Sequence, residues 1–248
     1  MSPGDAFLIT IAGMAAGTIN TVVGSGSLIT FPTLIALGYP PILANVSNNI
    51  GLVPGSVSGV VGYRRELRGQ RDRLVRLVPA SLMGGLIGSI LLLTLPSAVF
   101  TRVVIVLLLI ALTLVVVQPR LSRWLASRGH AHARITVPLM ALVGAAGIYG
   151  GYFGAAQGII LIALLGIFVA DDLQRLNAVK NVLAMSVNLV ASVTFILATE
   201  VNWAIVGCIA VGSVIGAQLG AKYGRRLDPR ALRAVIVVVG IWALVRLL

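Results

Sequence analysis

The feature that most constrains the fold is the alternation of long apolar segments with short gaps that hold most of the charge. The apolar segments fall at about residues 6–37, 42–63, 74–95, 99–117, 136–170, 177–199, 201–221 and 231–248. Six of them have about 18–23 residues, enough to cross a ~30 Å hydrocarbon core once as an α-helix. With 58% hydrophobic and 10% charged residues, the chain is predicted to be an all-α polytopic membrane protein embedded in a lipid bilayer.

Two segments, 6–37 and 136–170, are too long for one crossing, and each contains a glycine-rich break about two-thirds of the way along. The first break is Gly24, Ser25, Gly26 and Ser27, and the second is residues 154–158. Only about 11–12 residues follow each break, which is too short to span. We therefore expect two re-entrant helical hairpins whose breaks are buried in protein or line a cavity, since bare backbone is costly in lipid. The alternative is ten ordinary crossings with water-exposed turns.

The positive charge indicates how the segments are oriented. The basic gaps are residues 63–76, 120–134 and 222–233, whereas gaps 95–98 and 199–202 are short and poor in positive charge. Placing the basic gaps in the cytoplasm makes the first hairpin begin and end outside and the second begin and end inside. The net charge of +12 is thus explained by topology, and no nucleic-acid partner is expected.

The two halves also resemble each other in sequence. At a shift of 132, Asn45 and Asn49 align with Asn177 and Asn181, and at a shift of 128 a pair of glycines recurs (Gly84 and Gly88, Gly212 and Gly216). Glycines four residues apart are typical of closely packed membrane helices. We predict two inverted-topology repeats, each a hairpin plus three transmembrane helices. The first repeat is 1–118 (hairpin 6–37, helices 42–63, 74–95 and 99–117), the basic cytoplasmic linker is 119–135, and the second repeat is 136–248 (hairpin 136–170, helices 177–199, 201–221 and 231–248).

Polar residues within the apolar segments mark a candidate binding site, because such residues are costly in lipid and usually face a cavity. Their amides and hydroxyls can donate to an oxyanion, Lys180 can supply charge, and half-helix N-termini add backbone N–H groups. A small anion is the expected substrate. The candidate substrate-binding residues are Asn20, Ser25, Gly26, Ser27, Asn45, Asn48, Asn49, Gln157, Gly158, Lys180 and Asn181. Two alternatives stay open: the asparagines only bond between helices, and Lys180 extends to the cytoplasmic interface.

No catalytic residue, metal site or cofactor is predicted. A nucleophilic Ser25 would need a nearby base, and the only histidines, His130 and His132, lie in a basic gap where we expect a solvated loop. All seven acidic residues fall at segment ends or in gaps, so a carboxylate proton relay is not expected. Proton coupling is left open.

The pattern resembles the sulfite exporter TauE/SafE family of membrane permeases. The resemblance is carried by residues 12–17, 23–34 and 44–49 and by a similar glycine-rich pattern in the second half of the chain, at residues 147–158. This family is usually more glycine-rich where this chain has Ser25, Ser27 and Gln157, a departure that bears on the substrate.

The resemblance implies a secondary transporter for sulfite, an organosulfonate or a related sulfur-containing anion, multi-pass in a bacterial inner membrane. We expect it to work by alternating access, as a monomer or homodimer. An anion channel of the same fold and a membrane-embedded enzyme are the alternatives.

Overall fold

The computed structural model describes residues 1–127, 135–224 and 229–247, and of residues 97, 98, 101, 121–127, 229–232 and 247 it describes the backbone alone. The described residues form helices and no strands. The helices are α1 (Pro3–Val22), α2 (Ser27–Ala36), α3 (Pro41–Gly62), α4 (Arg71–Thr94), α5 (Ser97–Ser127), α6 (Val137–Tyr152), α7 (Gln157–Phe168), α8 (Leu173–Ala198), α9 (Trp203–Tyr223) and α10 (Pro229–Leu247). His130 and His132 lie outside the described residues.

Both long apolar segments are divided where the glycine-rich breaks were predicted. Helix α2 begins at Ser27 and helix α7 at Gln157. The break backbones are alike, because Gly24 and Gly154 both have a positive φ, 87° and 75°, which glycine adopts without steric cost. In each break two successive N–H groups bond to one carbonyl, that of Ile19 in the first hairpin and of Tyr149 in the second.

The remaining helices follow the predicted segments with ends shifted by a few residues, except for α5. Helix α5 runs on through Pro119 to Ser127, within the range 119–135 predicted as a linker. A proline removes one backbone donor without necessarily ending a helix, and the Leu, Arg and Ala residues that follow favour helix. The linker is therefore shorter than predicted.

Five of the described helices are long and apolar enough to cross a membrane: Pro3–Val22, Arg71–Thr94, Leu173–Ala198, Trp203–Tyr223 and, within α5, Arg102–Arg120. Helices α2, α6 and α7 are apolar but shorter. Helix α3 has 22 residues, yet its asparagines and serines lower its hydropathy. The chain has the helical content of a multi-pass membrane protein.

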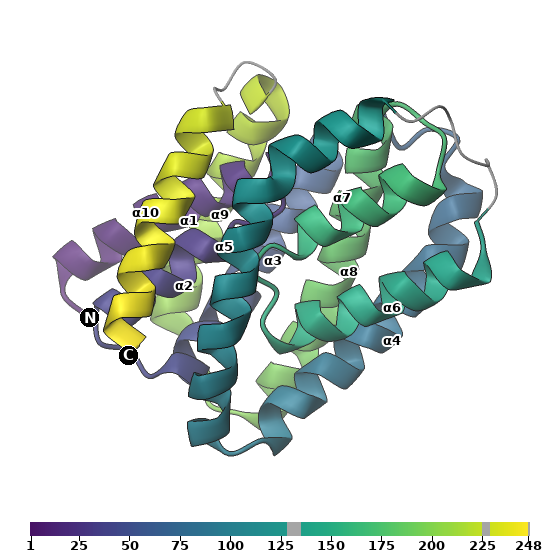
Figure 1. Ribbon diagram of the computed structural model, residues 1–248. Helices are drawn as coiled ribbons and strands as arrows, with labels where there is room; N and C mark the ends of the chain where they lie inside the picture. The colour runs from purple at the N-terminus through teal and green to yellow at the C-terminus, as the bar shows by residue number, and fades with distance from the viewer. Residues whose placement is uncertain (128–134, 225–228, 248) are drawn as a thin grey trace.

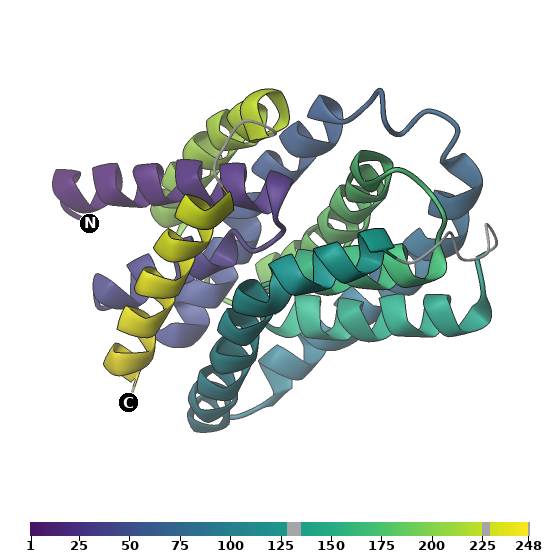
Figure 2. The same ribbon diagram turned by 45° about the horizontal axis from the view of Figure 1, so that its top comes forward.

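The helices pack in pairs that recur between the two halves of the chain. Helix α1 packs on α9, and α6 packs on α4 (Figures 1 and 2). Helix α3 contacts α9 as α8 contacts α4, and α2 contacts α10 as α7 contacts α5. The hairpin of each half thus packs mainly on helices of the other half, which makes one interlocked body.

Glycines make the closest helix contacts, as their spacing predicted. A Cβ on Gly216 of α9 would lie 1.9 Å from the carbonyl oxygen of Met14 on α1. A Cβ on Gly88 of α4 would lie 2.1 Å from that of Ile148 on α6. No larger residue fits at either position without moving a backbone.

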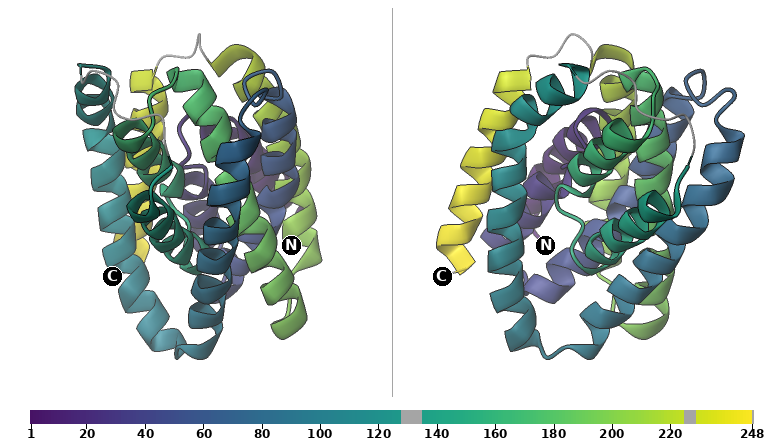
Figure 3. Two further views of the ribbon diagram at one scale, coloured as in Figure 1. Left: turned by 90° about the vertical axis from the view of Figure 1, so that its right-hand side faces the viewer. Right: turned by 45° about the vertical axis from the view of Figure 1, so that its right-hand side comes forward.

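The connections between helices gather at two opposite ends of the molecule. The α4–α5 and α8–α9 connections lie at one end, and the α3–α4 and α7–α8 connections lie at the other (Figure 3). The two hairpins enter from opposite sides of the view in Figure 1, and their breaks meet near its centre.

Candidate functional site

The two hairpin breaks touch each other through backbone atoms. The N–H of Gly158 donates to the carbonyl oxygen of Gly24 at 3.0 Å. A Cβ built on either glycine would lie 2.4 Å from the Cα of the other. Only two glycines allow this approach. The contact brings the first turns of α2 and α7 together in the interior of the protein.

Two polar side chains beside this contact are buried without hydrogen-bond partners. Ser25 is 1% exposed and Gln157 is 3% exposed. Neither the Ser25 Oγ nor the Gln157 Nε2 has a partner among the described residues, and the same holds for the Tyr152 hydroxyl. Buried polar groups are almost always hydrogen-bonded, so these atoms indicate a place for a polar ligand or water. A Ser25 without a partner also lacks the hydrogen-bonded base that a nucleophilic serine requires.

The starts of α2 and α7 bring two helix N-termini near the same place. In the described structure neither N-terminus has a side-chain cap: Gly26 precedes α2, and Ala156, with φ 62°, precedes α7. The N–H groups of Gln157, Gly158 and Ile159 already donate to backbone carbonyls, as do those of Leu28 and Ile29. These helix ends therefore contribute the partial positive charge of the helix dipole, which suits an anion. Ser27, the first residue of α2, is half-buried, and Gly26 lies against α1, where a Cβ would be 2.3 Å from the Ala16 carbonyl oxygen.

Side chains of α8 converge on the C-terminal end of α1. The Lys180 Nζ donates to the carbonyl oxygens of Asn20 at 3.2 Å and Thr21 at 3.4 Å. Asn177 and Asn181 donate to the Thr21 carbonyl at 3.2 and 3.4 Å. Lys180 is 1% exposed, so the residue is buried among the described helices. These donors satisfy helix-end carbonyls that have no partner within α1.

The asparagines of α3 bond to other protein groups. Asn45 donates to the carbonyl oxygen of Tyr152, the last residue of α6, at 3.0 Å. This repeats the way in which Asn177 binds the end of α1. Asn48 accepts from the Thr30 hydroxyl, and Asn49 accepts from the Ser192 hydroxyl at 2.9 Å. The structure therefore brings Asn45 and Asn48 to the hairpins and Asn49 to α8, in each case as a helix-to-helix contact.

A small cavity reaches the end of α1 from the side of the α3–α4 and α7–α8 connections. Its volume is about 110 Å³. Its lining residues are Val22, Val23, Tyr63, Gln118, Ile162, Leu173, Gln174, Asn177 and Gly224. Asn177 both lines this cavity and binds the Thr21 carbonyl, so the cavity ends next to the group bound by Lys180.

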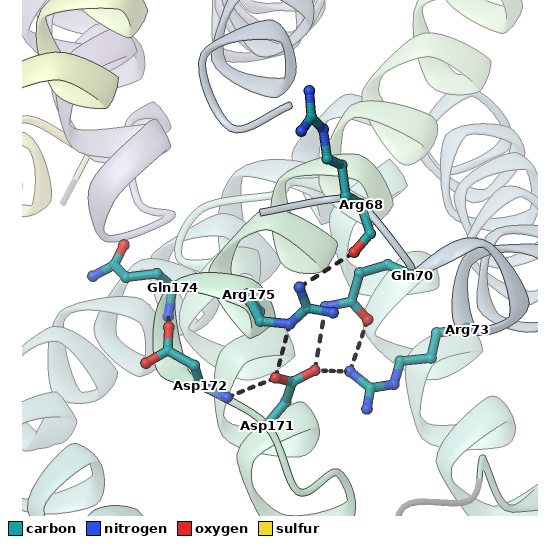
Figure 4. A network of polar contacts seen from close by, with 7 residues as sticks. All are labelled: Arg68, Gln70, Arg73, Asp171, Asp172, Gln174 and Arg175. Carbon is teal, nitrogen blue, oxygen red and sulfur yellow. Dashed lines mark hydrogen bonds and ion pairs between the residues drawn. The ribbon is translucent and has the colours of Figure 1, made fainter. Parts of the chain in front are cut away.

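A charged network joins the connections at this end of the molecule (Figure 4). The Asp171 carboxylate pairs with Arg73 on one oxygen and with the Arg175 Nε at 2.9 Å on the other. Gln70 and the Arg68 carbonyl complete the network. Burial raises the pKa of the Asp171 carboxyl, but hydrogen bonds from the two arginines and a backbone N–H outweigh burial and hold that pKa below its ordinary value.

Sequence reasoning missed the backbone role of Asn20 and left Thr21, Asn177 and Gly24 out of the candidate residues. The carbonyls of Asn20 and Thr21 act through backbone, which side-chain chemistry does not reveal. Asn177 shares a helix face with Lys180 at a spacing of three, a signal that could have placed it among the candidate residues. Gly24 is recognisable in the sequence as part of a break, but only its contact with Gly158 shows why a glycine is needed there.

Comparison with known proteins agrees with the helical membrane architecture. The family model described as sulfite exporter TauE/SafE matches residues 9–247. The chain is 28% identical to the probable membrane transporter protein ORF9 of a Sinorhizobium species, over 98% of this chain and 92% of that protein. It is 25% identical to the probable membrane transporter protein YfcA of Escherichia coli K12, over 91% and 83% of the two chains. No solved structure matches. The chain is a multi-pass membrane transporter that belongs to the sulfite exporter TauE/SafE family.

Proposed function

We propose that this chain is an alternating-access secondary transporter for a small sulfur-containing anion such as sulfite or an organosulfonate, in a bacterial inner membrane. The observation that carries the proposal is the pair of buried donors without partners, the Ser25 Oγ and the Gln157 Nε2, beside the touching breaks. An oxyanion at this place would accept from both donors. Tetrahedral and pyramidal sulfur oxyanions offer several acceptor oxygens to such a cluster.

The helix ends support an anionic ligand. The N-terminal ends of α2 and α7 lie beside these donors, and the helix dipoles give both ends a partial positive charge. Lys180 lies on the neighbouring end of α1 and supplies the positive charge. In this proposal Asn45, Asn48 and Asn181 hold the hairpins in place, Asn49 ties α3 to α8, and Asn20 and Ser27 border the site.

The recurring packing pairs support the two inverted repeats, with re-entrant hairpins, that the sequence predicted. Transporters of this kind place their site where broken helices of the two repeats meet. The pair formed by the Asn188 Nδ2 and the Ser56 Oγ, at 3.4 Å, supports this arrangement, because the two positions are equivalent at the shift of 132 and would lie near a twofold axis. Alternating access would then move one repeat against the other around the breaks.

Ligand-induced stabilisation tests the site directly. Purified protein is heated with sulfite, sulfate, thiosulfate, methanesulfonate or sulfoacetate, and at least one anion is expected to raise the melting temperature by mass action. Ser25→Ala and Gln157→Ala should each lower the affinity for that anion on the order of tenfold or more, because a hydrogen bond to a charged group is lost. No shift with any anion would refute the proposal.

Two matched variants control for loss of a polar side chain. Ser186→Ala removes a buried hydroxyl that already bonds within its own helix, to the Val182 carbonyl at 2.8 Å. Gln218→Ala removes an exposed amide that contacts Ser58. Both should leave the affinity unchanged. If they lower the affinity for the anion as much as Ser25→Ala and Gln157→Ala do, the effect comes from general instability and not from a lost contact with the anion.

Flux into proteoliposomes separates a carrier from the alternatives. A carrier shows saturable uptake and counterflow of labelled sulfite or sulfoacetate, whereas an anion channel of the same fold shows no counterflow. A membrane-embedded enzyme would convert its substrate and lose that conversion in Ser25→Ala. Saturable counterflow without conversion is the expected result.

A further inference from the structure

We infer that the Lys180 ammonium is the counterion of the transported anion, and that the proton on this amine binds and leaves together with the anion. This inference rests on the proposed function and deepens it by naming the coupling ion. It begins from the position of the amine, on the Asn20 and Thr21 carbonyls at the end of α1. In transporters, carbonyls at the C-terminal ends of broken helices are places that hold a coupling cation. Here a tethered amine fills that place.

The hydrogen bonds of Lys180 fit both protonation states. A neutral amine has two N–H groups, which suffice for the two carbonyls. An ammonium has a third N–H, and no described residue accepts from it. The third donor is therefore available to a ligand only when the proton is present.

The protein supplies no full negative charge to balance this ammonium within the described residues. Lys180 makes no ion pair with any of them. Among the helices that pack on α8, α3 and α7 contain no ionisable residue and α6 contains only tyrosines, Tyr149 and Tyr152. Of the two acids at the start of α8, Asp171 is already paired with two arginines, and Asp172 is an exposed N-cap residue that accepts from the Gln174 N–H. The ionisable residues of α4 lie in its first two turns: Arg71, Asp72, Arg73 and Arg76.

An ammonium buried in this way is costly without a counterion. Removing a charge from water is strongly unfavourable unless an opposite charge joins it. The C-terminal end of α1 offers only a partial negative charge. The empty site thus favours the neutral amine, and the anion-filled site favours the ammonium. By reciprocity, the anion raises the affinity for the proton by the same factor as the proton raises the affinity for the anion.

The cavity next to Asn177 gives the proton a route to solvent. It is lined by Asn177, whose side chain donates to the same Thr21 carbonyl as Lys180 does. When the anion leaves, one N–H bond of the ammonium breaks, its electron pair stays on nitrogen, and the proton passes to water in this cavity. One monoanion and one proton are then exchanged per binding event.

Calorimetric titration of the wild-type protein with methanesulfonate or sulfate, both ionised across the whole range, tests the inference between about pH 6 and pH 9.5. Buffers of different ionisation enthalpy count the protons taken up. Above the pH at which the empty site loses its proton, affinity should fall about tenfold for each pH unit, with up to one proton taken up per anion. A flat affinity with no proton uptake would overturn the inference and leave the proposed function intact. Failure of every anion in the stabilisation panel to bind would overturn both.

Variants of the two lysines locate the effect. Lys180→Arg keeps a permanent charge and should bind with an affinity that does not change over the same pH range. Lys222→Arg changes a lysine at the end of α9 and should keep the wild-type pH dependence and proton uptake. If Lys222→Arg flattens the pH dependence, or if folded Lys180→Arg retains it together with proton uptake, the proton binds elsewhere and the inference is wrong.

Discussion

At the scale of single residues, the most exacting position is the glycine pair where the hairpins touch. Gly24 needs a positive φ of 87°, and a Cβ on it would lie 2.4 Å from the Cα of Gly158. We predict that Gly24→Ala and Gly158→Ala each reduce the free energy of unfolding by about 1–3 kcal/mol or more. The melting temperature of the purified protein should fall accordingly. Thermal unfolding in detergent measures the effect.

A glycine in open space is the matched control for this prediction. A Cβ added to Gly207 of α9 would meet no atom of another segment within 4 Å. Gly207→Ala should therefore be neutral or slightly stabilising, since alanine favours helix. Equal loss of stability in Gly207→Ala and Gly24→Ala would contradict the steric explanation.

At the scale of elements, the Asp171 network ties the α3–α4 connection to the start of α8. The pKa of Asp171 is depressed in the folded protein, so its contribution to stability is present above its ordinary value of 3.8 and is lost as the pH falls through the folded value. Wild-type protein should lose melting temperature on acidification below about pH 4, and the difference between wild type and Asp171→Asn should shrink there. Glu200→Gln, at the opposite end of the molecule, is the control. A difference that stays constant with pH would contradict this account.

The orientation of the helices gives a second prediction at this scale. Leu95 and Glu200 lie in connections at one end of the molecule, and Arg65 lies in a connection at the other. In a Cys208→Ala background, cysteines at positions 95 and 200 should react with an impermeant thiol reagent from outside the cell, and one at position 65 should not. Labelling of only one of the first two from outside would contradict the predicted topology.

The two hairpins match each other in packing but not in length. Gly17 of α1 lies against the Ser213 carbonyl, and Gly151 of α6 lies against that of Gly85. Ser213 and Gly85 are 128 residues apart, the same shift that relates Gly84 of α4 to Gly212 of α9. The two contacts are therefore equivalent in the two halves of the chain.

Beyond this matched contact, α1 is one turn longer than α6. Helix α1 continues from Gly17 to Val22, whereas α6 ends one residue after its own matched glycine. The additional turn contains Asn20 and Thr21, whose carbonyls Lys180 binds. The asymmetry of the site thus comes from one turn of helix in a nearly symmetric frame.

Much of this frame was predictable, and the site was only partly so. The breaks were predictable because glycine and serine interrupt otherwise continuous apolar runs, and α2 and α7 begin at Ser27 and Gln157, within the predicted breaks. The continuation of α5 past Pro119 was not, because a proline ends some helices and only weakens others. The partners of Lys180 were also beyond reach, because they are carbonyls whose position depends on the length of α1.

At the scale of the whole molecule, coupling one proton to one monoanion makes transport electrically silent. The loaded site holds an ammonium and an anion, and the empty site holds a neutral amine. Neither the loaded nor the empty transporter therefore moves net charge across the membrane when it changes conformation. Each uncompensated charge would respond to voltage by about 2.3 kcal/mol per 100 mV. Uptake of methanesulfonate into proteoliposomes should therefore be unchanged by a potassium diffusion potential, while an imposed pH gradient should drive it. A strong response to voltage alone would contradict the one-to-one ratio.

The Gly24–Gly158 contact between the hairpins separates the mechanical contact of the two halves from the selectivity of the binding site. The Gly24–Gly158 contact is built of main-chain atoms, whereas the groups beside it, Ser25 and Gln157, are side chains. Replacing those two side chains by others leaves the main-chain contact chemically unchanged. A protein built in this way can acquire a new substrate by point mutation without rebuilding its mechanism, which makes positions 25 and 157 the natural targets for directed evolution of its selectivity.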